Sequence, residues 1–255
     1  MSFEPTQVKG LFFDIYATLI DWEAGIYPFL LRLAQKLPQS YPLHADTTET
    51  RKTLLHMYAA TERVVEHDNP TLAYPQILEK VYARIAAELG VVGQHDDQVA
   101  FGRSIGEWPA FSDTVAAMQT LAKYYKLVVL SNVDDASFAR TCAGPLKSVH
   151  WDGIYTAEQI GSYKPNPANY NYVATKFQET FGISKDQIAL VAQSLDIDHM
   201  SCKALGFKPG VWIARGAAHM GGNQDEMEAK GLIELGVTYI TLGEFAKAVE
   251  RAFSS

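Results

Sequence analysis

The chain has 255 residues, enough for one large or two modest domains with a substantial core. Its composition is ordinary for a globular protein, with 47% hydrophobic and 20% charged residues. The formal net charge of −7 argues against a nucleic-acid or anionic-membrane partner, because both need a basic face.

The sequence carries no targeting or membrane signal. The two cysteines, Cys142 and Cys202, have neither a CxxC nor a paired spacing, which fits a reducing compartment and leaves no thiolate zinc site. The N-terminus has no basic region followed by a long apolar run, so no signal peptide is visible. Apolar stretches are strand-sized, well short of the ~20 residues of a membrane span. We therefore expect a cytoplasmic protein without a membrane partner.

Short apolar runs rich in β-forming residues predict the strands of a sheet. The runs are continuous rather than alternating, as expected of parallel strands covered on both faces, and helical patterns lie between them. This alternation predicts an α/β fold with a doubly wound parallel sheet. In chain order, the predicted strands are residues 11–13, 127–130, 188–192, 211–214 and, more weakly, 237–242, and the clearest helical patterns between them are residues 113–126 and 167–182, with Gly182 as a C-cap.

The segment from Asp21 to Pro109 interrupts this alternation. It has no convincing strand but several helical patterns, and the clearest is residues 74–90, with Pro75 suited to the first turn and Gly90 past the end. Long insertions at strand ends commonly shape binding sites. We expect a helical cap of residues 21–109, inserted after the first strand of an α/β core of residues 1–20 and 110–255.

Polar side chains follow the predicted strands, at the edge where an open parallel sheet binds its ligands. Taken singly, each has a simpler explanation as a turn residue, a helix cap or a solvated charge. Their joint placement at one rim favours a reaction site. The residues are Asp14, Tyr16 and Thr18 after the first strand, Ser131 and Asn132 after the second, Lys164 and Tyr170 in and after the segment GSYKPNP, and Asp198 after residues 188–192.

Four segments resemble the four motifs of the haloacid dehalogenase superfamily, and the resemblance covers nearly the whole chain. They are FDIYATL at residues 13–19, LSN at 130–132, YKPNP at 163–167 and the strand followed by Asp198. FDIYATL is more similar to the L-2-haloacid dehalogenase (type II) branch, which reads FDxYGTL, than to the phosphatases. Phosphatases carry a second Asp where this chain has Tyr16, and an acidic metal ligand where it has Ser194.

The resemblance implies metal-independent hydrolysis of a carbon–halogen bond in a small 2-haloacid, with no cofactor. Asp14 would attack the halogen-bearing carbon, and water would then hydrolyse the resulting ester. Lys164 would orient Asp14, and Asp198 would position or activate the water. Thr18 and Ser131 would hold Asp14 and the substrate carboxylate by hydrogen bonds.

The substrate-binding residues that the resemblance implies include departures from the family pattern. Ala17 replaces a Gly, which is a small change if the backbone there avoids positive φ. The family's cap supplies an Arg near residues 54–58, where His56 is the only basic residue. The implied pocket residues are Tyr16, Asn132, Tyr170, His56 and Tyr74, together with Gln193 and Leu195, which stand where the family has a Ser and an Asn lining the water site.

Two alternatives remain open. A divergent Mg²⁺-dependent phosphatase would use Asp196 or Asp198 to complete a metal site, although Tyr16 counts against it. A protein that keeps the fold but only binds would explain Leu195 and the missing cap Arg, although a retained pair of Asp14 and Lys164 counts against it. In every case the expected partner is a small molecule, and a homodimer is expected by analogy alone.

Overall fold

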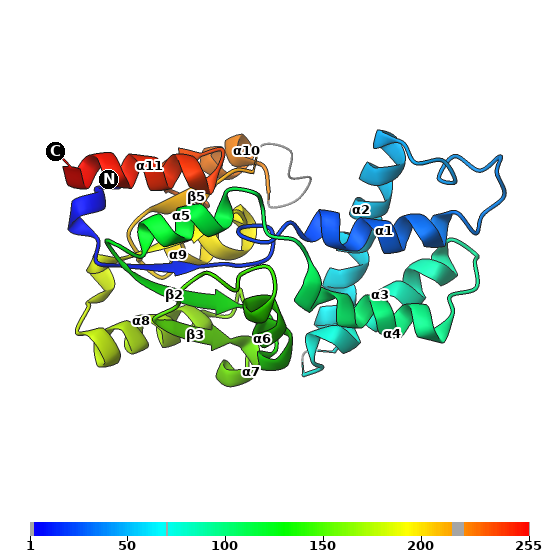
Figure 1. Cartoon of the computed structure of the whole chain (residues 1–255), viewed down its shortest axis with the longest axis horizontal. Helices are drawn as coiled ribbons and strands as arrows, with labels where there is room; N and C mark the ends of the chain where they lie inside the picture. Colours follow the sequence, from blue (N-terminus) through cyan, green and yellow to red (C-terminus); the bar gives the residue numbers. More distant parts are fainter. Residues whose placement is uncertain (1–2, 70, 216–221, 255) are drawn as a thin grey trace. The chain divides into compact units, whose positions relative to one another are not determined.

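The computed structural model describes residues 3–69, 71–215 and 222–254 (Figure 1). It divides into two compact units: unit 1 falls within Met1–Ile20, Ala110–Asn132 and Leu146–Ser255, and unit 2 is Asp21–Pro109 with Val133–Pro145. Residues 133–145, which the sequence analysis assigns to the α/β core, thus belong to the helical unit. The reason is local packing, because Arg140 donates to Arg103 O at 3.3 Å and its side chain lies against Gly106.

A six-stranded parallel sheet in the order β3-β2-β1-β4-β5-β6 forms the centre of unit 1. Gly10 of the first strand pairs with Lys126 on one side and Ile188 on the other, so the apolar runs lie side by side in register. The predicted doubly wound α/β fold is therefore confirmed. The strands are β1 (Gly10–Phe13), β2 (Lys126–Ser131), β3 (Gly153–Thr156), β4 (Ile188–Ala192), β5 (Gly210–Ile213) and β6 (Leu235–Tyr239).

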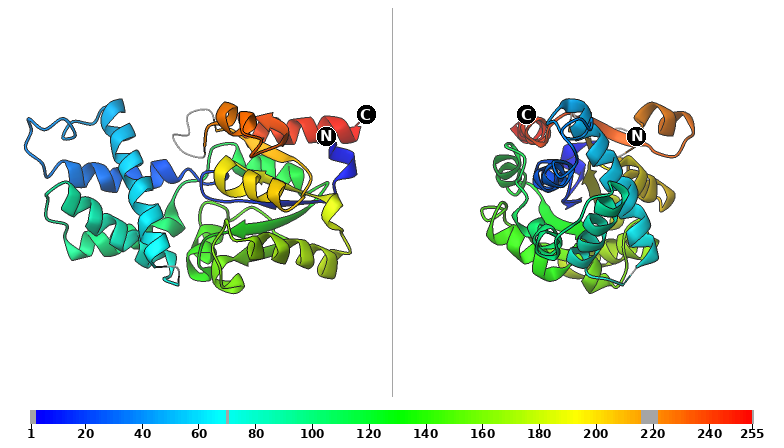
Figure 2. Two further views of the ribbon diagram at one scale, coloured as in Figure 1. Left: turned by 180° about the vertical axis from the view of Figure 1, so that it is seen from behind. Right: turned by 90° about the vertical axis from the view of Figure 1, so that its right-hand side faces the viewer.

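Helices cover both faces of this sheet, which is why its central strands are apolar on both sides. Tyr170, Val173 and Phe177 of α8 pack on Phe12 of β1 and on same-face residues of β2 and β4. Figures 1 and 2 show α5 and α11 on the opposite face. The helices of unit 1 are α5 (Thr114–Leu121), α7 (Ala157–Ile160), α8 (Pro167–Phe181), α9 (Met200–Ala204), α10 (Gln224–Ala229) and α11 (Leu242–Ser254), with the short turns η1 (Pro5–Gln7), η3 (Lys185–Gln187) and the π-helical η4 (Leu195–His199).

One strand was not predicted, and two predicted elements have other bounds in the structure. The strand not predicted is β3, whose sequence GIYT is short and which pairs on one side with β2 only. The last strand ends at Tyr239 rather than at residue 242, because Leu242 begins α11. Helix α5 ends at Leu121, since the chain must become extended at Lys126 to pair with β1. Helix α8 ends as predicted, with Gly182 at φ +66°.

Unit 2 is helical, and its described residues contain no strand. Asp21 and Thr47 cap two of its helices by accepting hydrogen bonds from Ala24 N and Thr50 N. Tyr58 and Tyr82 pack around the ring of Phe101 to form an aromatic core. Its elements are α1 (Trp22–Ala34), α2 (Thr48–Asp68), α3 (Tyr74–Glu88), α4 (His95–Arg103), η2 (Ser104–Glu107) and α6 (Asp135–Ala143). Among the helices described in either unit, none has the length and apolar character to cross a membrane.

Candidate active site

Asp14 directly follows β1 at the carboxyl edge of the sheet. Its backbone N–H continues the ladder by donating to Val191 O of β4 at 3.3 Å, so the strand pairing fixes where the side chain starts. The side chain is 12% exposed, and both carboxylate oxygens accept hydrogen bonds, from Lys164 Nζ at 2.8 Å and from Thr18 Oγ1 at 2.7 Å. The buried charge that the sequence places at a strand end is thus paired and hydrogen-bonded.

Lys164 bridges the two predicted carboxylates. Its Nζ lies 2.8 Å from Asp14 Oδ1 and 2.9 Å from Asp198 Oδ1, and the side chain is 3% exposed. Burial alone lowers the pKa of Lys164, but the charges of Asp14 and Asp198 outweigh it, so the net shift is upward and the ammonium stays charged. The structure therefore brings three of the predicted catalytic side chains into one buried ionic cluster.

Asp198 reaches this cluster from the π-helical turn η4. Tyr170 of α8 supports the turn, because its hydroxyl donates to Ile197 O at 3.0 Å and lies 3.4 Å from Asp198 Oδ1. Burial raises the pKa of Asp198, the Lys164 ammonium lowers it, and Asp14 raises it again, with a net result of about 7. Asp198 is thus more easily protonated than an ordinary aspartate, and burial is the main cause.

Thr18 links the loop after β1 to the end of β4. Its hydroxyl donates to Asp14 Oδ2 and accepts from Gln193 N at 2.9 Å, and the side chain is fully buried. Gln193 also accepts, through its carbonyl oxygen, a hydrogen bond from Trp212 Nε1 at 2.8 Å. The main chain of Gln193 therefore holds Thr18, whereas the sequence analysis expected its side chain to line the water site.

Ser131 and Asn132, at the end of β2, differ in their hydrogen bonds. Ser131 Oγ is buried and is one of the few such atoms in the described residues without a hydrogen-bond partner, so it is available to a ligand. Both amide atoms of Asn132 instead bind the backbone of Lys164: Nδ2 donates to Lys164 O at 3.1 Å, and Lys164 N donates to Oδ1 at 2.6 Å. The expected substrate contact at Asn132 thus has a structural partner already.

Ala17 adopts φ +78°, the left-handed region that favours glycine. The sequence analysis treated the change from the family's Gly as small on the condition that φ is not positive, and this condition is not met. A Cβ in this region costs roughly 1–2 kcal/mol. The loop that carries Asp14 and Thr18 therefore contains a strained residue, which the surrounding contacts hold in place.

Leu195 does not join the cluster around Lys164. It is fully buried against Met227 and Ile233, in a separate apolar cluster, at the start of the π-helical turn η4. Tyr16 lies in the loop after Asp14 and is partly exposed.

The two expected cap residues, His56 and Tyr74, belong to unit 2. His56 is exposed on α2. Tyr74, at the start of α3, donates its hydroxyl to Glu62 Oε1, and Tyr58 donates to the same oxygen at 2.6 Å. Burial, and next the charge of Glu62, raise the pKa of Tyr74, so its hydroxyl stays protonated. These contacts give Tyr74 a role inside the helical unit.

Sequence reasoning missed Arg215, the second residue after the end of β5. The guanidinium is buried and donates from Nε and Nη2 to Thr18 O at 2.9 and 2.7 Å. Its position after the predicted strand 211–214, at the same edge as Asp14, was the available signal.

The donors around Asp14 do not match a magnesium site. Mg²⁺ requires near-octahedral oxygen coordination, and here an ammonium lies between the two carboxylates. Asp196, the other candidate ligand, accepts a hydrogen bond from Ser194 Oγ at 2.9 Å. Over residues 3–69, 71–215 and 222–254, no three His, Cys, Asp or Glu side chains are grouped to hold a metal ion.

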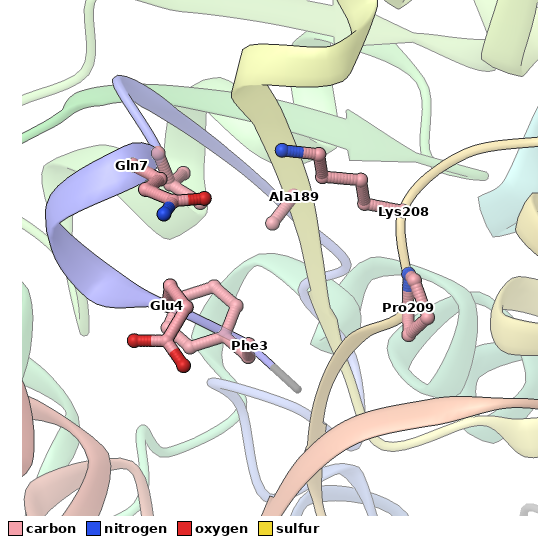
Figure 3. Close-up of a pocket in the computed structure, with 7 residues that line it drawn as sticks. Phe3, Glu4, Gln7, Ala189, Lys208 and Pro209 are labelled. Atoms are coloured by element: carbon pink, nitrogen blue, oxygen red, sulfur yellow. The ribbon is translucent and has the colours of Figure 1, made fainter. Parts of the chain in front are cut away.

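A small pocket of about 60 Å³ lies at the opposite edge of the sheet (Figure 3). Phe3, Glu4 and Gln7 line one side, and Ala189, Lys208 and Pro209 line the other. These residues precede or begin strands, whereas ligands of parallel sheets bind beyond the carboxyl ends. The pocket is therefore separate from the Asp14 cluster.

Comparisons with known proteins identify the family and the fold. The model of the haloacid dehalogenase-like hydrolases matches residues 8–206. The fold is similar to an L-2-haloacid dehalogenase, PA0810 (21% identity, 96% of this chain and 99% of that one, TM-score 0.70). It is also similar to the L-2-haloacid dehalogenase of Xanthobacter autotrophicus with chloropropionic acid covalently bound (16% identity, 95% and 98%, TM-score 0.67).

A third similar structure is the HAD-hydrolase YfnB of Bacillus subtilis, described as bound to magnesium (16% identity, 95% and 98%, TM-score 0.67). No curated protein matches the chain. At these identities the structural likenesses concern the fold, whereas the family model covers most of the chain, from before β1 to beyond α9. The chain therefore belongs to the haloacid dehalogenase-like hydrolases.

Proposed function

We propose that this hydrolase uses Asp14 as a nucleophile and releases halide from a small 2-haloacid through a covalent ester. One observation carries the proposal: Lys164 Nζ lies within hydrogen-bond distance of both Asp14 and Asp198, at 2.8 and 2.9 Å. A fixed cation keeps the nucleophile ionised and oriented, and a second carboxylate beside it is placed to act on water.

In the first step, a carboxylate oxygen of Asp14 forms a bond to C2 of the substrate as the carbon–halogen bond breaks. The halide leaves with the bonding electron pair, and the configuration at C2 inverts. Halide needs no proton to depart, so the site requires no general acid beside the nucleophile. The presence of Tyr16, where superfamily phosphatases carry a second Asp, supports this choice.

In the second step, water attacks the ester carbonyl carbon of Asp14, and Asp198 accepts the proton of that water. The 2-hydroxy acid leaves as its oxygen takes that proton back from Asp198, and the Asp14 carboxylate is restored when the second proton of the water passes to solvent. The negative charge of Asp14 is one of the causes that raise the pKa of Asp198, and ester formation removes this charge. Asp198 is therefore more fully ionised in the ester than in the free enzyme, at the step that uses it as a base.

We propose that neither step uses a metal. Lys164 already neutralises one oxygen of each carboxylate, and the neighbouring acid Asp196 accepts a hydrogen bond from Ser194. The similar structures include both kinds of ligand, a covalently bound chloropropionic acid and a magnesium ion. The donor set of this chain supports the former chemistry.

A paired assay tests the proposal. The protein is incubated with 2-chloropropionate and EDTA while chloride is measured, and separately with Mg²⁺ and a phosphate-ester panel while phosphate is measured. We expect EDTA-resistant chloride release that disappears in Asp14→Asn and persists in Asp225→Asn, a matched change at an exposed carboxylate. A single turnover in oxygen-18 water should place the label on Asp14, because water attacks the enzyme ester.

Phosphate release that requires Mg²⁺, without chloride release, would replace this proposal by the phosphatase alternative. Label that enters the 2-hydroxy acid directly in a single turnover would exclude the ester and favour direct attack by water on the substrate. Neither halide nor phosphate release would favour a protein that binds without turnover.

A further inference from the structure

Arg215 holds the backbone of the loop that carries the nucleophile. Its Nε and Nη2 donate to a single acceptor, Thr18 O, at 2.9 and 2.7 Å. The two residues are 197 positions apart in the sequence, so the contact ties the end of β5 to the loop after β1. A planar guanidinium that binds one carbonyl oxygen through two N–H groups limits both the distance and the direction of that carbonyl.

The guanidinium is itself fixed on its other sides. Asp113 Oδ1 accepts from Nη1 at 2.7 Å, and the ring of Phe111 lies 4.0 Å from the guanidinium carbon. Asp113 Oδ2 accepts from Gly243 N at 2.9 Å, which anchors the carboxylate to the start of α11. The charge is thus paired and packed, as a buried arginine requires, and the direction of its donors is set before any ligand binds.

The residue whose carbonyl Arg215 holds also binds the reacting carboxylate. The same residue, Thr18, donates through Oγ1 to Asp14 Oδ2 at 2.7 Å. The preceding residue, Ala17, is in the left-handed region at φ +78°, a conformation that persists only where neighbours enforce it. Release of Thr18 O would let Ala17 relax toward negative φ and would carry the Thr18 hydroxyl away from Asp14.

We propose that Arg215 is a positioning residue for the nucleophile, which acts by holding Thr18 so that its hydroxyl fixes one oxygen of Asp14. This inference rests on the proposed function for its kinetic consequence, but the orientation of Asp14 is measurable without turnover. Arg215 touches neither Asp14 nor Lys164 in any hydrogen bond described above. Because its contact with Thr18 reaches Asp14 through the Thr18 hydroxyl, we expect its loss to lower kcat more than substrate affinity.

The test compares Arg215→Met, which keeps length and removes all donors, with Arg84→Met, the same change at an exposed site of α3. The protein is labelled with carbon-13 at the aspartate carboxyl, and the Asp14 signal is assigned by its loss in Asp14→Asn. We expect Arg215→Met to shift the Asp14 signal and Arg84→Met to leave it unchanged. In chloride release from 2-chloropropionate, we expect kcat to fall by about 10- to 100-fold in Arg215→Met with little change in KM.

Arg215→Lys is the second variant, because it retains the buried charge and tests the geometry if Arg215→Met does not fold. A single ammonium cannot reproduce two donors to Thr18 O and one to Asp113, so we expect an Asp14 shift and a kcat between those of wild type and Arg215→Met. An unmoved Asp14 signal in a folded Arg215 variant overturns the proposal, as does a rise in KM at constant kcat. If wild type releases no halide, the proposed function fails while the Asp14 signal still decides the role of Arg215.

Discussion

Asn132 holds the backbone of Lys164 on both of its polar groups, donating to the carbonyl oxygen at 3.1 Å and accepting from the N–H at 2.6 Å. Lys164 in turn donates to Asp14 and Asp198. The Asn132 side chain therefore fixes the backbone from which the Lys164 side chain extends to both carboxylates. This makes Asn132 a positioning residue for the ammonium.

The first prediction concerns Asn132→Ala. Both hydrogen bonds to Lys164 are lost and two backbone groups are left without a partner, so we expect the free energy of unfolding to fall by roughly 1–3 kcal/mol. The kcat for halide release should fall while KM stays close to the wild-type value. Urea unfolding and steady-state kinetics measure the two effects. A raised KM with unchanged kcat would instead identify Asn132 as a substrate contact.

The second prediction concerns Lys164→Met, which leaves two buried carboxylates without their shared cation. Removal of one partner from a buried ion pair typically costs about 3–5 kcal/mol. Without the ammonium, the pKa of Asp198 rises further above that of the unfolded chain, because burial and the charge of Asp14 still raise it while the opposing charge of Lys164 is gone. A carboxyl whose pKa is raised on folding loses stability as pH rises through the folded-state value.

The stability deficit of Lys164→Met relative to wild type should therefore be larger at pH 8 than at pH 5. Urea denaturation at the two pH values measures it, with Lys247→Met, an exposed lysine of α11, as the matched control. A deficit that is the same at both pH values would mean that the ammonium does not compensate these charges.

The third prediction concerns the ester step. In Asp198→Asn the nucleophile and its lysine remain, so one equivalent of halide should be released rapidly, and the ester on Asp14 should then accumulate. Rapid-quench halide measurement and mass spectrometry of the peptide that contains Asp14 detect the two events. In wild type, ester hydrolysis should increase with pH with a midpoint at or below about 7, because Asp198 must be ionised. The same pH dependence in Asp198→Asn would assign it to another group.

Sequence patterns predict which residues meet at this site because of the topology of the sheet. Parallel strands end at one edge, so the residues that follow the apolar runs are brought together whatever lies between them. Asp14 and Asp198, which follow β1 and β4, are close in space for this reason, and Lys164, 150 positions after Asp14, joins them from the segment after β3 and α7. The same argument accounts for the placement of Thr18, four residues after Asp14.

The features that sequence patterns did not predict depend on backbone conformation or distant contacts. Leu195 packs against Met227 and Ile233, which its place after β4 does not reveal. The identity of Ala17 does not reveal its positive φ. Arg215 is recognisable as a partner of Thr18 only once β5 lies in the same sheet as β1. Strand β3 lacked an apolar signal because it pairs on one side only.

The last prediction follows from the strain at Ala17. Ala17→Gly removes the Cβ that disfavours φ +78°, and it also increases the conformational freedom of the unfolded chain. The strain of roughly 1–2 kcal/mol exceeds the entropic cost of roughly 0.4–1 kcal/mol, so we expect the free energy of unfolding to rise by up to about 1 kcal/mol. Ala83→Gly, the same substitution inside α3, should instead lower it by about 1 kcal/mol, because helical glycine is unfavourable. Urea denaturation of the two variants and wild type gives both signs in one experiment. If Ala17→Gly instead lowers the free energy of unfolding as much as Ala83→Gly does, the left-handed conformation of Ala17 is not strained.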